Sequence, residues 1–265
     1  MSDATTLQPS LSTGIFRKRP LAEAVDPIAR AGFRWIEISR RSRDWAEGLR
    51  AVSDAGLKVW AVHGRGVFYL DSPDEQACRK VIDAERRAMD EIAPCAPCPY
   101  VFHFMRISNA PEGDAPARRR VAELLEHARQ VNLTLALEPL PPKMNIDRYV
   151  GDAKVVAALA KSFESPHAAV CLDSNHSNLG EDLCGAISDC AGMIASVHLS
   201  DNLGVTDDHL PPGDGGIDWP ATLRALGRAG YSGAINLEIH WADTPSAELL
   251  ARLRVWAEGA AAMIR

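Results

Sequence analysis

Short runs rich in β-branched and aromatic residues alternate along the chain with longer segments whose apolar residues recur at helical spacing. The short runs predict strands at residues 10–16, 34–39, 58–63, 100–105, 133–138, 168–173, 195–200 and 234–240. Eight strands that alternate with helices over about 250 residues are typical of a closed (β/α)₈ TIM barrel. We therefore expect one barrel domain spanning residues 1–265. An open, doubly wound sheet is the alternative, but no glycine-rich phosphate loop follows the first run.

Two of the helical segments have recognisable ends. Residues 72–93 predict a helix with Ser72 as its N-cap, Pro73 in the first position and Glu75 completing a capping box. The residues expected on its buried face are Ala77, Val81, Ala84, Ala88 and Ile92. Another helix is predicted to begin at Asp218 and to end at Gly230.

The strand runs have two distinct faces, because successive side chains of a strand point to opposite sides. In "LTLALE", Leu135 and Leu137 fall on one face, and Ala136 and Glu138 fall on the other. The other runs behave alike, with Trp60 placed among the large apolar residues and a polar residue at each C-terminal end. We expect the large apolar residues to face the helices and the polar ones to face the barrel axis. The C-terminal strand ends form one rim, where barrel enzymes carry their chemistry.

Four consecutive strand ends carry residues that can bind metals, namely Glu138, Asp173, His198 and Glu238. In a closed barrel these side chains converge on the axis. Three carboxylates and an imidazole packed closely would repel and desolvate one another unless a cation compensates them. Such an oxygen-rich set suits Mn²⁺, Mg²⁺ or Co²⁺ better than a structural zinc ion. The alternative is that each residue is an ordinary buried polar group with a hydrogen-bond partner.

The distribution of histidines supports a site at the same rim. Six of the eight histidines lie at strand ends or in the loops that follow them: His63, His103, His176, His198, His209 and His240. The "PPGDGG" segment (211–216) predicts a loop on this rim, with glycines that permit close backbone approach to a ligand. A plain flexible turn is the alternative for this loop.

Composition and charge limit the kinds of partner and the location expected for this protein. A net charge of −6 without a dense Lys/Arg block argues against nucleic acid. The basic clusters are "RRSR" (40–43) and "ARRR" (117–120), and the second is expected to be a solvated helix face. No apolar run approaches the roughly 20 residues of a membrane helix. The start lacks the features of a signal peptide, and six scattered cysteines indicate reduced thiols, so we expect a cytoplasmic protein. The C-x-x-C of Cys95 and Cys98 is expected to be a loop that enters a strand.

The segments "LALEPLPP", "CLDSNH", "VHLSDN…DDHLPPGDGGIDW" and "NLEIHW" resemble the xylose isomerase-like barrel superfamily, in particular its sugar phosphate isomerase/epimerase branch. The resemblance implies that Glu138, Asp173, His198 and Glu238 bind one divalent metal ion. It also implies that His176 contacts substrate or a further metal, and that Glu138 and Glu238 move protons on opposite faces of the substrate.

The expected activity is therefore the isomerisation or epimerisation of a small sugar, sugar phosphate or related hydroxy-carbonyl compound. A metal ion that chelates a carbonyl oxygen and the neighbouring hydroxyl stabilises the developing ene-diolate as a Lewis acid. Ketose 3-epimerases of the family carry an arginine where this chain has Gly204, so we expect the substrate end recognised there to be handled differently.

Other activities stay open at this point. His63, His103, His176, Asp207 and His209 fall where the related endonuclease IV group places ligands for additional zinc ions, and His240 is a further candidate for substrate or metal. The metal ion could therefore be zinc, and the site could hold more than one ion. A multi-zinc phosphodiesterase is the corresponding alternative activity. A lyase or dehydratase on the same metal is a further alternative, as is a barrel that only binds a sugar acid. The sequence leaves open whether the chain forms a homo-oligomer.

Overall fold

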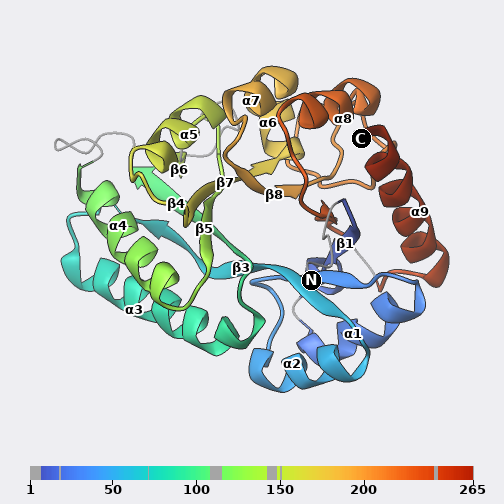
Figure 1. Cartoon of the computed structure of the whole chain (residues 1–265), viewed down its shortest axis with the longest axis horizontal. Helices are drawn as coiled ribbons and strands as arrows, with labels where there is room; N and C mark the ends of the chain where they lie inside the picture. Colours follow the sequence, from blue (N-terminus) through green and yellow to red (C-terminus); the bar gives the residue numbers. More distant parts are fainter. Residues whose placement is uncertain are drawn as a thin grey trace.

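Parallel strands form a closed barrel, and helices surround it, in a computed structural model (Figure 1). The structure describes residues 7–17, 19–70, 72–107, 115–141, 148–149, 151–241 and 244–264, with the backbone alone at 65–69, 104–107 and 148–149. Neighbouring strands follow the order β8-β7-β5-β4-β3-β2-β1-β9. Leu199 closes the ring, because it bridges to Leu237 and its amide donates to the carbonyl of Asn236 at 2.9 Å. The predicted (β/α)₈ barrel is confirmed, whereas the assignment of residues 1–265 to one domain stays a prediction.

The barrel strands lie close to the predicted runs. They are β1 (Pro9–Ser12), β2 (Trp35–Ile38), β3 (Lys58–Tyr69), β4 (Pro99–Ile107), β5 (Thr134–Leu137), β7 (Ala168–Asp173), β8 (Ile194–His198) and β9 (Ile235–Leu237). A short strand, β6 (Arg148–Tyr149), pairs antiparallel with the end of β4. The helices are α1 (Leu21–Arg30), α2 (Trp45–Asp54), α3 (Glu75–Ile92), α4 (Ala115–Gln130), α5 (Ala153–Lys161), α6 (Ser174–Gly180), α7 (Leu183–Asp189), α8 (Trp219–Arg228) and α9 (Ala247–Ile264).

Several element ends differ from the prediction for local reasons. The first strand stops at Ser12, because a 3₁₀ helix (Thr13–Phe16) follows it directly. The predicted N-cap of α3 is wrong: Asp74 caps the helix by accepting a hydrogen bond from the amide of Ala77. The buried face of α3 is also rotated from the predicted one, and it consists of Cys78, Ile82, Glu85, Ala88, Met89 and Ile92. The predicted start of α8 at Asp218 is confirmed, and Asp218 is its N-cap.

The two faces of the strands divide as predicted. Large apolar residues such as Leu135 and Leu137 belong to the main core between sheet and helices. A separate small cluster of Val101, Ala136 and Cys171 occupies the axis side. Trp60 is an exception, and its predicted position among the helices is wrong. The pairing of β2 with β3 shifts register there, and the Trp60 indole donates to the Oγ of Ser196 at 3.1 Å.

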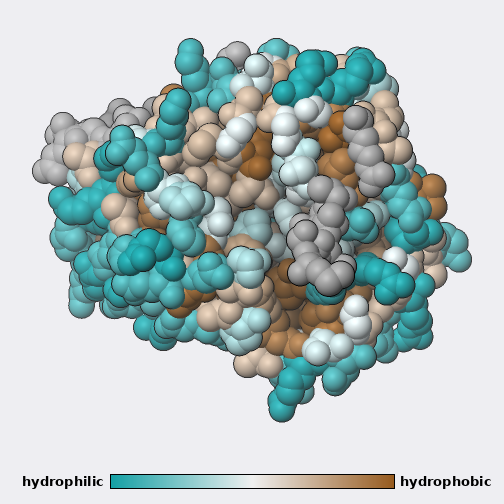
Figure 2. Space-filling view, viewed as in Figure 1, coloured by the Kyte–Doolittle hydropathy of each residue, from teal (hydrophilic) through white to brown (hydrophobic). Residues whose placement is uncertain are grey.

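The outer surface is mostly hydrophilic over the helices, and apolar residues lie nearer the middle of the face seen in Figure 2. The predicted solvated face at residues 117–120 is wrong for Ala117 and Arg120 of α4, which are buried. The guanidinium of Arg120 pairs with Glu75 at 2.8 Å and donates to the carbonyl of Ser72. Cys95 ends a short 3₁₀ helix (Ala93–Cys95), and Cys98 directly precedes β4, so the pair lies just before a strand as predicted. Among the described helices, none is long and apolar enough to cross a bilayer.

Candidate metal centre

Four predicted ligands meet at the C-terminal end of the barrel. Glu138 follows β5, Asp173 ends β7, His198 ends β8 and Glu238 follows β9. One donor atom from each of the four lies within 4.8 Å of the others. The Nδ1 atom of His198 lies 3.1 Å from Glu138 Oε1 and 3.0 Å from Glu238 Oε2. These side chains all point to the barrel axis from the ends of parallel strands. This common direction brings residues up to 100 positions apart in the chain to one point.

Asp173 is held by the start of the next helix. Its Oδ1 accepts hydrogen bonds from the amides of Asn175 at 2.6 Å and His176 at 3.1 Å, so it caps α6. This cap leaves Oδ2 free to face the other carboxylates, 3.7 Å from the Nδ1 of His176. The short helix α6 was not predicted, and its first turn is what returns His176 to the site.

Buried acceptors without a hydrogen-bond partner mark a position for a cation. Among the described residues, buried Asp173 Oδ2 has no hydrogen-bond partner, and buried Glu138 Oε2 has only the ion-pair contacts of His103 and His63, at 3.0 and 3.6 Å. Burying a carboxylate oxygen without a partner is costly, and a bound cation removes that cost. The residues present therefore fit a divalent ion.

Histidines surround the carboxylates, and two of them carry positive charge that balances the negative charge of the carboxylates. Burial lowers the pKa of His176, but Asp173 and Glu138 outweigh burial and raise it to about 10. Burial likewise lowers the pKa of His209, and Asp173 and Asp207 raise it to about 9. Burial, together with the charge of Glu138, raises the pKa of the Asp173 carboxyl to about 6 despite these histidines. Without an ion, protonated histidines are thus the positive charge of the site.

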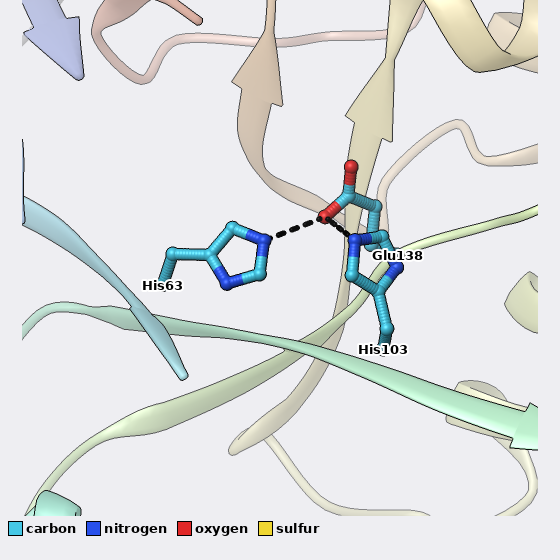
Figure 3. A group of neighbouring side chains, drawn as sticks. All are labelled: His63, His103 and Glu138. Carbon is cyan, nitrogen blue, oxygen red and sulfur yellow. Dashed lines mark ion pairs between the residues drawn. The ribbon is translucent and has the colours of Figure 1, made fainter. Parts of the chain in front are cut away.

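His63 and His103 point at the same oxygen of Glu138 from neighbouring strands (Figure 3). The Nε2 of His63 lies 3.6 Å from Glu138 Oε2, and the Nε2 of His103 lies 3.0 Å from it. Burial lowers the pKa of both histidines, for His103 to about 3, so they are neutral and able to act as ligands or hydrogen-bond donors. With Glu138 they form a second group that could hold an ion.

A third group consists of Asp173, His176 and His209. Asp207 lies beside it, with Oδ1 3.1 Å from the Nε2 of His209 and 3.7 Å from the Nε2 of His176. His240 stacks on His209 with ring centroids 4.0 Å apart. The structure thus brings every predicted site residue to one end of the barrel, although His240 and Asp207 fall outside the described ligand groups.

Glu37 on β2 is a residue that the sequence analysis missed. Its Oε2 lies 2.7 Å from the Nε2 of His198 and accepts a hydrogen bond from the Asn236 amide at 3.0 Å. Ser10 in turn donates to Asn236 at 2.8 Å. A fully buried charge within the apolar run "WIEI" was the available signal. When Nε2 of His198 donates a hydrogen bond to Glu37, Nδ1 is left to face the other ligands.

Cys171 is the other missed residue. It lies two positions before Asp173 on the same axis-facing side, and it groups with Glu138 and His198 within 4.8 Å. Burial raises the pKa of its thiol, so the neutral form is favoured in the metal-free protein.

The loop after β8 is organised by the buried carboxylate of Asp201. Its two oxygens accept hydrogen bonds from the amides of Asn202, Gly213 and Ile217 and from the indole of Trp219, at 2.8 to 3.0 Å. A Cβ on Gly215 would lie 2.3 Å from Asp201 Oδ1. The close approach that this glycine permits is to Asp201, an internal anchor that fixes the loop carrying Asp207 and His209. The expected approach of this loop to a ligand stays a prediction.

Comparison with known proteins assigns the class. A family model described as the xylose isomerase-like TIM barrel matches residues 25–265, and the chain belongs to this family. The uncharacterized protein y4fM of Sinorhizobium fredii is 32% identical over 254 residues, covering 82% of this chain and 80% of the relative.

Two further matches are to proteins with named activities. The ketose 3-epimerase of Arthrobacter globiformis is 23% identical over 259 residues, covering 92% of this chain and 86% of the relative. The crystal structure of a D-tagatose 3-epimerase-like protein superposes with a TM-score of 0.81 at 16% identity, covering 97% of this chain and 98% of that chain. At that identity the structural likeness shows the shared fold.

Proposed function

We propose that this protein is a divalent-metal-dependent isomerase or epimerase of a small sugar, sugar phosphate or related hydroxy-carbonyl compound. The observation that carries the proposal is the group of Glu138, Asp173, His198 and Glu238, whose donor atoms lie within 4.8 Å of one another. Relatives named as ketose 3-epimerase and L-ribulose-5-phosphate 3-epimerase support the reaction type.

The four residues of this group would hold the ion. The oxygen-rich set favours Mn²⁺, Mg²⁺ or Co²⁺, with zinc as the alternative. When bound, the ion supplies a Lewis acid for a carbonyl oxygen and the neighbouring hydroxyl.

Glu138 and Glu238 are the proposed acid–base pair. They approach Nδ1 of His198 from two strands on either side of β8 along the barrel, through separate oxygens at 3.1 and 3.0 Å. The histidines around them hold the pKa of each carboxyl well below its ordinary value, although burial alone raises it. One carboxylate takes a proton from the carbon next to the carbonyl, and the other returns a proton to the same or the neighbouring carbon.

The outer histidines are proposed to contact the substrate or to hold further ions. His63 and His103 lie on one side of Glu138, and His176 and His209 lie beyond Asp173 with Asp207. His240 is proposed as a substrate contact beside His209. In the described part of the chain, none of the six cysteines forms a disulfide, which supports the proposed cytoplasmic location.

A multi-zinc phosphodiesterase is the second candidate function. It is favoured by one observation: Glu138 and Asp173 are each shared between the central group and a histidine-containing neighbour group. Shared carboxylates of this kind are suited to bridging ions about 3.5–4 Å apart, as in two-metal hydrolases. A lyase or dehydratase is an alternative on the central ion alone, because it begins with the same proton abstraction.

Metal analysis and isotope exchange together test the proposal. Protein purified without added ions is expected to contain about one equivalent of manganese, magnesium or cobalt for an isomerase, and about two or three of zinc for the phosphodiesterase. Incorporation of solvent deuterium at a sugar carbon, across a panel of ketoses and keto acids, supports proton transfer. A loaded protein that exchanges no proton with any member of the panel contradicts the proposed reaction.

Replacing Glu37 with glutamine is expected to weaken metal binding by about 10- to 100-fold without unfolding the barrel. The glutamine can still bond to Asn236, but it removes the charge that fixes the Nε2 proton of His198. The measurement is the dissociation constant of Mn²⁺, obtained by calorimetric titration.

The matched control for this variant is Glu181→Gln, a partly buried carboxylate whose described hydrogen bonds come from Ser177 and the amide of Ala153 and from none of the proposed ligands. An unchanged affinity in Glu37→Gln, with normal folding by circular dichroism, contradicts the positioning role of Glu37.

A further inference from the structure

Two arginines occupy a tight turn at the C-terminal end of β2. The amide of Ser42 donates to the carbonyl of Ser39 at 3.0 Å, which closes a four-residue turn with Arg40 and Arg41 at its centre. These arginines belong to the "RRSR" cluster, to which the proposed acid–base chemistry gives no role. The turn follows Glu37 by only a few residues, so it lies on the same rim as the candidate metal centre.

The base of this turn is fixed by buried neighbours. Thr13 accepts a hydrogen bond from the amide of Ser39 at 2.9 Å, and its hydroxyl lies 2.8 Å from that of Ser42. The indole of Trp45 donates to the carbonyl of Ser42 at 3.0 Å. A loop held in this way presents its central side chains in a defined place, which lowers the entropy lost when they bind a ligand.

The two guanidinium groups are half-buried and unpaired. In the part of the chain that the structure describes, neither Arg40 nor Arg41 makes a side-chain hydrogen bond or ion pair. This contrasts with Arg120, which is buried with Glu75 as its partner. Arginine presents a planar fork of donors suited to carboxylate and phosphate, so a free, half-buried pair is prepared for an anion.

The turn lies beside the candidate metal centre. Since β2 lies between β1 and β3 in the sheet, the turn that follows β2 lies between the rim ends of these two strands. The carboxylates of Glu238 and Asp207 attract the charge of Arg41.

We infer that Arg40 and Arg41 bind the anionic end of the substrate, a phosphate or a carboxylate, while its carbonyl end lies at the candidate metal centre. This inference rests on the proposed function and narrows its substrate class to acidic or phosphorylated hydroxy-carbonyl compounds. The rest of the described rim carries Asp207, Glu238 and the central carboxylates, which repel an anion. Within the described rim, the arginine turn adds two guanidinium groups that pair with no carboxylate, and these can stabilise a negative group.

Calorimetric titration of the Mn²⁺-loaded protein tests the inference with three probes: D-ribulose, D-ribulose 5-phosphate and D-glucuronate. We expect at least one of the two anions to bind about tenfold or more tightly than D-ribulose. The Arg40→Gln/Arg41→Gln double variant is expected to lose that preference and to keep its affinity for D-ribulose. If the double variant binds D-ribulose 5-phosphate more weakly, the recognised group is a phosphate. If it binds D-glucuronate more weakly, the recognised group is a carboxylate.

Arg43→Gln is the matched control, since Arg43 is an exposed arginine at the end of the same turn. It is expected to bind all three probes as the unmodified protein does. The inference is overturned if the unmodified protein does not prefer either anion, or if the double variant retains the preference. Metal content and deuterium exchange into D-ribulose report separately on the proposed function, so the two failures are distinguishable.

Discussion

Replacing Glu238 with glutamine is expected to abolish measurable turnover while the barrel still folds. The substitution keeps the volume of the side chain but removes the carboxylate that would take or return a proton. General acid–base groups contribute about a hundred- to ten-thousandfold to a rate, and this residue is also a proposed ligand of the ion. Glu238 follows the last barrel strand and has 12% of its side chain exposed, so its loss leaves the packed core intact.

The measurement is solvent deuterium incorporation into the substrate, made at a concentration of Mn²⁺ that saturates the variant. Saturation separates loss of the proton-transfer group from loss of the ion. Asp208→Asn serves as the matched control, since it removes a carboxylate from the neighbouring loop without touching the proposed ligands. A Glu238→Gln variant with full activity and normal metal content would refute the assigned role.

The barrel and its axis-facing residues could be predicted because alternation along a strand is a local property. Once Glu138, Asp173 and His198 were placed at strand ends, closure of the sheet alone brought them together. The same alternation places Glu37 on the axis side of β2. The sequence pattern did not reveal it because the candidate ligands stand at strand ends, whereas Glu37 lies within its strand.

Other features depend on contacts between distant segments, and no local pattern reveals them. Trp60 departs from alternation because β2 and β3 shift register. Arg120 can be buried because its guanidinium bonds to Glu75 and to the carbonyl of Ser72. Both residues are 45 or more positions away in the sequence. The sequence shows that the glycines of residues 211–216 permit close approach, but only the folded loop shows that Gly215 approaches Asp201.

Removal of the ion by a chelator is expected to lower the melting temperature markedly. A ligand present at a thousandfold its dissociation constant stabilises the native state by about 4 kcal/mol. For a chain of this size that corresponds to roughly 8–16 °C, at about 2–4 °C per kcal/mol. The physical cause is the repulsion among Glu138, Asp173 and Glu238, which protonated histidines then have to balance alone.

The chelated protein is also expected to become less stable as the pH rises. The folded-state pKa values of His176 and His209 are about 10 and 9, above the ordinary value of 6.5. Their protonation therefore contributes stability that is fully present below pH 6.5 and is lost as the pH rises through 9 and 10. A bound ion takes over this charge, so the loaded protein should lose less stability over the same range.

Scanning calorimetry of the chelated and Mn²⁺-reloaded protein between pH 6.5 and 10 measures both effects. The gap between the two melting temperatures should widen with pH, and binding of Mn²⁺ should release protons, which titrations in buffers of different ionisation enthalpy detect. Equal melting temperatures throughout, with metal loss verified by elemental analysis, would mean that the carboxylates are balanced without an ion. That result would remove the physical basis for a metal centre at this end of the barrel, and with it the proposed route of proton transfer.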